Sequence, residues 1–224
     1  MPKSVAFALL TALVALGLLT DYGVSPARAG STHATVTPRP PTATITATAT
    51  ATPTPTATAT PTPTVTVRHY VFPVRSKGKI AYGAAHHDYP ATDIFCPIGS
   101  TFVAVTDGVV DFVSSVDRWN PASNKPELRG GLSVAIIGDD GVRYYGSHLS
   151  AIASGLVPGM RVAVGQTLGQ TGRSGDARST PPHLHFGISH PTTPDDWRTR
   201  RGEISPYRYL KAWARGEALT PQLP

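Results

Sequence analysis

Short apolar runs alternate with turn residues along the chain beyond residue 68. They predict strands at residues 101–105, 108–116, 132–137, 142–148, 167–171 and 183–189, with a shorter strand inside 157–166. The pair Asp107-Gly108 is a strong turn signal, and residues 138–141 join their flanking runs into a hairpin. Short strands at such close spacing indicate a mainly β domain built on a compact antiparallel β-sheet.

One stretch has the terminal signals of a helix. Residues 206–214 follow Ser205 as a candidate N-cap, have Pro206 at the first position, and end shortly before Gly216. We therefore expect a short C-terminal helix after the sheet. Residues 119–130, between two predicted strands, are expected to form an irregular loop.

The start of the chain has a different pattern. Lys3 precedes an apolar run at residues 5–19, and Ala27-Arg28-Ala29 fits a cleavage site, so residues 1–29 are predicted to be a signal peptide. The gap between the apolar run and Ala29 is long for a cleavage region, so an uncleaved anchor is the alternative. In either case we expect an exported domain that contacts a membrane only through this segment.

Residues 30–67 consist mostly of Thr, Pro and Ala. This composition cannot bury a core, and its repeated prolines favour extended conformations, so we expect a disordered linker that acts as a spacer. The chain thus divides into the signal segment 1–29, the linker 30–67 and a folded domain at 68–224. The core of that domain spans about residues 70–189, and a C-terminal helical extension follows.

Composition narrows the function only slightly. The net charge of +6 and the pI near 9.7 suit anionic surroundings but indicate no particular partner, and we expect no nucleic acid to bind. We interpret the basic residues Arg198, Arg200 and Arg201 as a solvated loop. The single cysteine, Cys96, excludes both an intramolecular disulfide and a cysteine-based zinc site, and we interpret it as a small buried apolar group.

The predicted strand at 183–189 carries the strongest chemical signal. Because side chains alternate between the two faces of a strand, His183 and His185 are expected on one face, and Leu184 and Phe186 on the other. Two neighbouring imidazoles can share a metal, or one can bind it while the other handles protons.

Three further stretches offer partners for this pair. His86 and His87 come shortly before Asp93, which opens an apolar run where a carboxylate is costly unless it is paired or metal-bound. His148 ends a predicted strand. A catalytic zinc needs three protein ligands and one open position, and further histidines can accept a proton or stabilise an oxyanion. The chain has enough residues for both tasks.

At these residues the sequence resembles the lysostaphin/LytM-type zinc metallopeptidases, which cut the peptide part of peptidoglycan. The resemblance covers about residues 70–189 and rests on several motifs in the family's order. These are a histidine closely followed by Asp93, TFVAVTDGVV at 101–110, YGSHL at 145–149, VPGMRV at 157–162, GQTLG and TG within 165–172, and PHLHF at 182–186.

The resemblance implies a role for each residue. The first histidine, Asp93 and His185 would bind one zinc ion per chain. His148 and His183 would line the reaction centre as general base and oxyanion stabiliser, with the assignment between them open. The family fold is a compact antiparallel β-sheet with its site in a groove across one face.

The first zinc ligand is where the sequence departs from the family. Three residues usually separate that histidine from the aspartate, but Tyr89 stands at the matching position here. Tyrosine is a poor zinc ligand, so an insertion is the simpler account. We favour His87 because it needs the smaller bulge, with His86 as the alternative.

We therefore expect an exported zinc-dependent endopeptidase that hydrolyses peptide bonds in peptidoglycan. It would act as a monomer, secreted and associated with the cell wall, on stem peptides or cross-bridges. Glycine-rich cross-bridges and bonds next to D-amino acids are both open as substrates. One alternative is a non-catalytic module of the same fold that binds the wall or activates another hydrolase. Another is a peptidase of the same chemistry that acts on a secreted protein.

Overall fold

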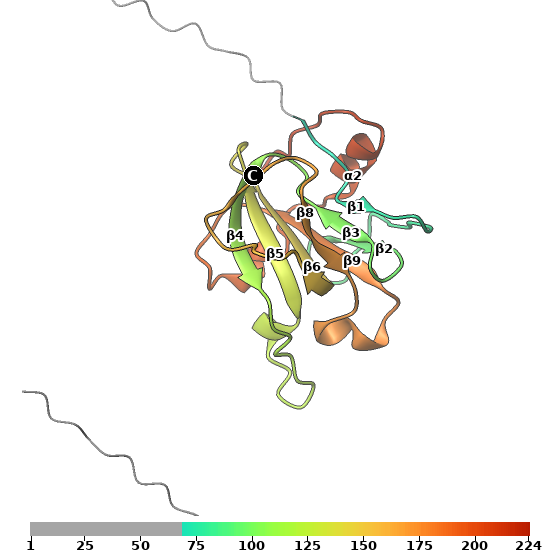
Figure 1. Ribbon diagram of the computed structural model, residues 1–224, viewed down its shortest axis with the longest axis vertical. Coiled ribbons are helices and arrows are strands. Elements are labelled where there is room, and N and C mark those ends of the chain that lie inside the picture. Colours follow the sequence, from blue (N-terminus) through green and yellow to red (C-terminus); the bar gives the residue numbers. More distant parts are fainter. Residues whose placement is uncertain (1–68) are drawn as a thin grey trace, which may run out of the picture. The chain divides into compact units, whose positions relative to one another are not determined.

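The computed structural model describes residues 69–224 (Figure 1). The predicted signal peptide at 1–29 and linker at 30–67 therefore lie outside the described residues. From residue 69 to residue 224, none of the helices has the length and apolar character that crossing a lipid bilayer requires.

The described domain is mainly β, as the spacing of the apolar runs predicts. Its sheet has nine strands, and every pairing between them is antiparallel. The strands are β1 (Val74–Arg75), β2 (Thr92–Phe95), β3 (Thr101–Val103), β4 (Gly108–Ser114), β5 (Leu132–Gly138), β6 (Arg143–Ile152), β7 (Arg161–Val162), β8 (Thr167–Thr171) and β9 (His183–Ser189). The order along the sheet is β1-β3-β8-β6-β5-β4-β7, with β9 pairing β6 and β2.

Strand β6 connects the two parts of this sheet. It pairs with β5 along one edge, while its other edge pairs first with β9 and then with β8 (Figure 1). In this register Ser147 lies opposite His185, and Leu149 lies opposite Thr171. The three strands β2, β9 and β6 therefore lie side by side, with β9 in the middle.

The two faces of β9 differ as alternation predicts. Leu184, Phe186 and Ile188 are fully buried in the hydrophobic core. His183 and His185 point to the opposite face, where they line a cavity. The alternation of side chains along β9 thus places core residues on one face of the strand and the candidate site histidines on the other.

The expected C-terminal helix is present as α2 (Tyr207–Ala214) and covers the core face. Its Trp213 ring lies 6.4 Å from that of Phe186 and 5.4 Å from that of Tyr70. The N-cap is Pro206 and not Ser205, because the first-turn amides of the helix donate to the main-chain oxygen of Pro206.

Three short helical segments were not predicted. They are the 3-10 helices η1 (Pro126–Leu128) and η2 (Gly175–Ser179), and the helix α1 (Trp197–Arg200). The α1 helix begins at Asp196, whose side chain accepts a hydrogen bond from the Thr199 amide. It follows β9 and contacts that strand, which brings the C-terminal segment to the histidine face.

Candidate metal centre

Asp93 and His185 are directly opposed across the β2–β9 pair. The register aligns their Cα atoms, and His185 Nδ1 lies 3.1 Å from Asp93 Oδ1. The other ring nitrogen of His185, Nε2, lies 2.9 Å from the main-chain oxygen of Arg201. Because a carbonyl oxygen only accepts, Nε2 carries a proton, and the Nδ1 lone pair can face the carboxylate. Two acceptors at that separation favour a cation or a proton between them.

The loop before β2 brings its histidine pair to the same carboxylate. His86 Nε2 lies 3.6 Å from Asp93 Oδ1, and His86 Nδ1 donates to the main-chain oxygen of Tyr89 at 3.1 Å. His87 is exposed, but its ring still offers a nitrogen, so that ligand atoms of His86, His87 and Asp93 lie within 4.8 Å of one another. Both histidines are thus within reach of Asp93.

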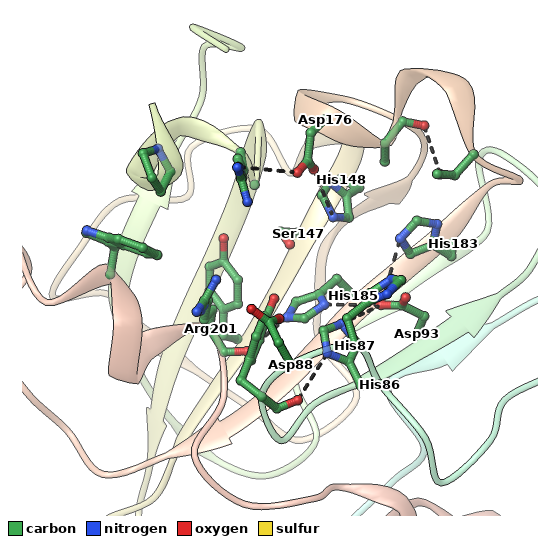
Figure 2. A pocket seen from close by; sticks show the side chains of 18 of the residues that line it. His86, His87, Asp88, Asp93, Ser147, His148, Asp176, His183, His185 and Arg201 are labelled. Carbon is green, nitrogen blue, oxygen red and sulfur yellow. Dashed lines mark hydrogen bonds and ion pairs between the residues drawn. The ribbon is translucent and has the colours of Figure 1, made fainter. Parts of the chain in front are cut away.

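His148 and His183 face the same space from β6 and β9 (Figure 2). Their ring centroids are 4.9 Å apart. His148 Nδ1 donates to the main-chain oxygen of Ser174, and His183 Nδ1 donates to that of Pro181, each at 2.9 Å. Both Nε2 atoms therefore keep a lone pair directed toward the cavity, which is the form that accepts a proton.

The backbone at His148 is left-handed, with φ of 63°. An L-residue in this region costs on the order of 1–2 kcal/mol, and histidine is one of the residue types that adopts it more often. The conformation occurs where β6 shifts its pairing from β9 to β8, and the His148 amide still donates to Gly130. The strand therefore turns a side chain into the cavity at some cost in backbone energy.

Electrostatics keep the carboxylate charged and two of the imidazoles neutral. Burial alone would raise the pKa of Asp93, but its hydrogen bond with His185 and the nearby histidines lower it to about 2. Burial, reinforced by the neighbouring imidazoles of His185 and His183, lowers the pKa of His148 to about 3. Burial likewise lowers the pKa of His86. At neutral pH the site thus presents an anionic oxygen beside the uncharged rings of His86 and His148.

This donor set fits zinc. Neutral imidazole nitrogens and one carboxylate oxygen are ordinary zinc ligands, and two ligands of one tetrahedral zinc at about 2.1 Å lie about 3.4 Å apart. The 3.1 Å and 3.6 Å separations of His185 and His86 from Asp93 bracket that value. Second hydrogen bonds from each ring to a main-chain oxygen would fix the ring orientations, as is usual for metal-bound histidine.

These groups line one cavity of about 600 Å³. It contains every site residue that the sequence suggests, namely His86, His87, Asp93, His148, His183 and His185. It also contains residues that sequence reasoning missed, among them Tyr89, Tyr145, Asp176 and Arg201. Asp176 Oδ1 lies 4.0 Å from His148 Nε2, and burial raises the pKa of this carboxyl.

The interpretation of residues 198–201 as a solvated loop is wrong for two of its three arginines. Arg198 is exposed, but Arg200 is only 6% exposed and Arg201 is partly buried against the cavity. Folding of α1 onto β9 places these cations beside the histidines, and no local pattern in the sequence signals this. The interpretation of Cys96 as a buried group is confirmed.

Comparisons with known proteins agree with this architecture. The model of peptidase family M23 matches residues 87–197. The L-Ala–D-Glu endopeptidase of Bacillus subtilis is 31% identical over 134 residues, which is 58% of this chain and 36% of the relative. The chain thus spans about a third of that relative's length.

One solved structure shows the same fold, and a second is similar in sequence. A candidate glycyl-glycine endopeptidase, lytM, from Ruminococcus gnavus is 24% identical, covers 67% of this chain and 62% of its own, and has a TM-score of 0.51. The catalytic domain of the peptidase lysostaphin from Staphylococcus simulans is 25% identical over 59% of this chain and 92% of its own, with a TM-score of 0.45. The sequence match and the antiparallel sheet lead to one conclusion: the segment at residues 87–197 is a peptidase family M23 domain.

Proposed function

We propose that this protein is an exported, zinc-dependent endopeptidase that hydrolyses peptide bonds in peptidoglycan. The observation that carries the proposal is the convergence of uncommitted histidine nitrogens on the Asp93 carboxylate inside an open cavity. Main-chain hydrogen bonds fix the tautomers of these histidines, and the fixed tautomers suit metal binding and proton transfer. The family of the domain supports peptide hydrolysis as the reaction.

The metal ligands we propose are His86, Asp93 and His185. The family match begins at His87, which supports the sequence expectation of His87 as first ligand. We favour His86 because its Nδ1 is held by Tyr89 and its Nε2 already lies 3.6 Å from the carboxylate, whereas His87 is exposed. A zinc ion held by these residues would polarise a peptide carbonyl and activate water for attack.

The chain's own residues would handle the protons and the developing charge. The Nε2 lone pair of His148 or His183 accepts a proton from the attacking water and can return it to the leaving amine. The other ring, once protonated, donates to the oxygen of the tetrahedral centre. Two imidazoles 4.9 Å apart can reach neighbouring atoms of one reacting peptide.

Peptidoglycan as the substrate rests on the relative and on the charge of the chain. The Bacillus subtilis relative is an L-Ala–D-Glu endopeptidase, and the net charge of +6 suits the anionic surroundings of a bacterial wall. Export through residues 1–29, a location at the wall and action as a monomer complete the proposal.

Digestion of purified peptidoglycan tests the function directly. We expect the full chain to release fragments with new free amino groups, to lose this activity in a chelator, and to regain it when zinc is added. Mass analysis of the fragments identifies the bond. Much less than one zinc per chain, with no fragments from any wall type, would favour a non-catalytic wall-binding module. Cleavage of a protein substrate, with no cleavage of any peptidoglycan, would instead favour a peptidase that acts on a secreted protein.

Separate alanine variants of the histidine pair test the first ligand. We expect His86→Ala to lose most of the bound zinc because it removes a nitrogen facing Asp93. We expect His87→Ala to keep it because the exposed ring lies outside that set. Zinc content by elemental analysis, beside thermal unfolding to confirm folding, gives the answer. The reverse pattern would assign the ligand to His87.

A further inference from the structure

Arg201 is a cation without an anion beside the proposed metal centre. Its side chain lines the cavity, and its Nε atom is buried with no hydrogen-bond partner (Figure 2). Among residues 69–224 its guanidinium forms neither an ion pair within 4.0 Å nor a side-chain hydrogen bond. Buried charged donors are normally paired, so an unpaired one in a cavity indicates a ligand.

Two aromatic rings hold this guanidinium in place. Its central carbon lies 3.7 Å from the ring centroid of Tyr89 and 5.0 Å from that of Trp197. Stacking uses the flat faces of a guanidinium and leaves its N–H edge free for a planar acceptor. Tyr89 belongs to the extra residues between the histidine pair and Asp93, which gives that insertion a role.

The other arginines of the cavity already have partners. Arg129 donates to Asn124 and lies 3.9 Å from Asp176, while the buried Arg200 donates to the main-chain oxygen of Pro194. Among the described arginines that line the cavity, this leaves Arg201 with its hydrogen-bonding edge unused.

The main chain fixes Arg201 relative to the metal centre. Its carbonyl oxygen accepts from His185 Nε2, so the residue that orients a proposed ligand also presents the guanidinium. This close approach needs Gly187, because a Cβ there would lie 2.2 Å from the Arg201 oxygen. In Figure 2, His185 lies between Arg201 and His183. A peptide crossing the reaction centre would therefore meet Arg201 within a few residues of the cleaved bond.

We propose that Arg201 binds a carboxylate of the substrate and thereby selects acidic wall peptides. A carboxylate matches the free guanidinium edge in charge and in geometry, and it accepts two parallel hydrogen bonds. A stem peptide offers two such groups, the glutamate carboxylate outside the peptide linkage and the C-terminal carboxylate. A neutral glycine cross-bridge offers neither. The inference rests on the proposed function and names the substrate within it.

Acid and amide forms of one stem peptide test this inference. Two peptide pairs are compared, one differing at the glutamate carboxyl and the other at the C-terminus. Binding to the zinc-loaded full chain is measured by calorimetry, and cleavage by mass analysis. We expect amidation at one of the two positions to weaken binding by about tenfold or more, since hydrogen bonds to charged groups are the strong ones. The affected pair identifies the carboxylate.

Two variants separate recognition from folding and from metal binding. Arg201→Gln keeps the main-chain bond to His185, so its zinc content should be unchanged while it binds acid and amide forms equally. Arg201→Lys keeps the positive charge but lacks the paired N–H donors of a guanidinium, so it should retain part of the preference for the acid form. If Arg201→Gln misfolds, Arg201→Lys takes its place in the test. The matched control is Arg198→Gln, at an exposed arginine of α1, the helix that ends just before Arg201, and this variant should keep the full preference.

Two results would overturn the inference. One is equal binding of acid and amide forms by the unmodified protein, and the other is a preference that survives in Arg201→Gln. The proposed function fails separately. A carboxylate preference in binding without any cleavage would refute the hydrolysis and leave the role of Arg201 standing.

Discussion

His185→Ala is expected to abolish both zinc binding and peptidase activity. The substitution removes the nitrogen closest to Asp93, at 3.1 Å, and leaves the carboxylate with a weaker set of ligands. It also frees the Arg201 carbonyl, which holds the ring in place. Since metal ions contribute several kcal/mol to such reactions, we expect a loss of about a thousandfold or more in kcat/KM. Elemental analysis of zinc and release of amino groups from peptidoglycan measure the two effects.

A histidine outside the cavity supplies the control for this variant. His69 is exposed at the start of the described domain, so His69→Ala should keep full zinc content and activity. Circular dichroism and thermal unfolding establish that His185→Ala keeps its fold. If folded His185→Ala retained one zinc per chain, His185 would not be a ligand, and the site would need a different third residue.

Much of the sheet could be predicted because its signals are local. Strand β9 has the expected bounds, 183–189, and its alternation places His183 and His185 together because neighbouring side chains point to opposite faces. Within residues 157–166, where the sequence predicts a short strand, the structure has only the two-residue strand β7, Arg161 and Val162. Local patterns indicate extended backbone, but pairing with β4 decides where a strand begins and ends.

The remaining site residues could not be predicted because they come together only in the folded domain. Arg201 reaches the cavity through the packing of α1 on β9, and its partner Tyr89 comes from a loop more than a hundred residues earlier. The left-handed backbone of His148 likewise has no local signal, since it arises where β6 changes partners. Such features follow from tertiary contacts rather than from spacing.

The choice between His86 and His87 as first ligand also depends on a contact that the sequence does not reveal, although both residues lie in one loop. Counting residues back from Asp93 favours His87, because the shorter insertion needs the smaller bulge. The structure instead gives His86 a main-chain partner at Tyr89 and a short distance to Asp93. A hydrogen bond that closes a loop on itself is invisible to a count of residues, so the zinc content of the two variants decides the assignment.

His183→Ala is expected to keep zinc and to lose activity. His183 Nε2 lies 3.8 Å from Asp93 Oδ1, farther than the nitrogens of His185 and His86, so the proposed ligand set is complete without it. Its lone pair faces the cavity because Nδ1 donates to Pro181. Loss of one group that transfers protons or stabilises charge typically costs about a hundredfold to ten-thousandfold in rate. Zinc content and kcat, measured on the same sample, check both halves of the expectation.

Glutamine variants then separate the two histidine roles. A glutamine side chain donates a hydrogen bond but accepts no proton at neutral pH, so it can replace an oxyanion donor better than a general base. His148 Nε2 lies 4.0 Å from Asp176 Oδ1, a carboxylate that can stabilise the imidazolium that forms when this ring accepts a proton. We therefore expect His183→Gln to retain more activity than His148→Gln. Normal turnover in His183→Ala would remove His183 from the reaction, and loss of zinc in that variant would make it a ligand.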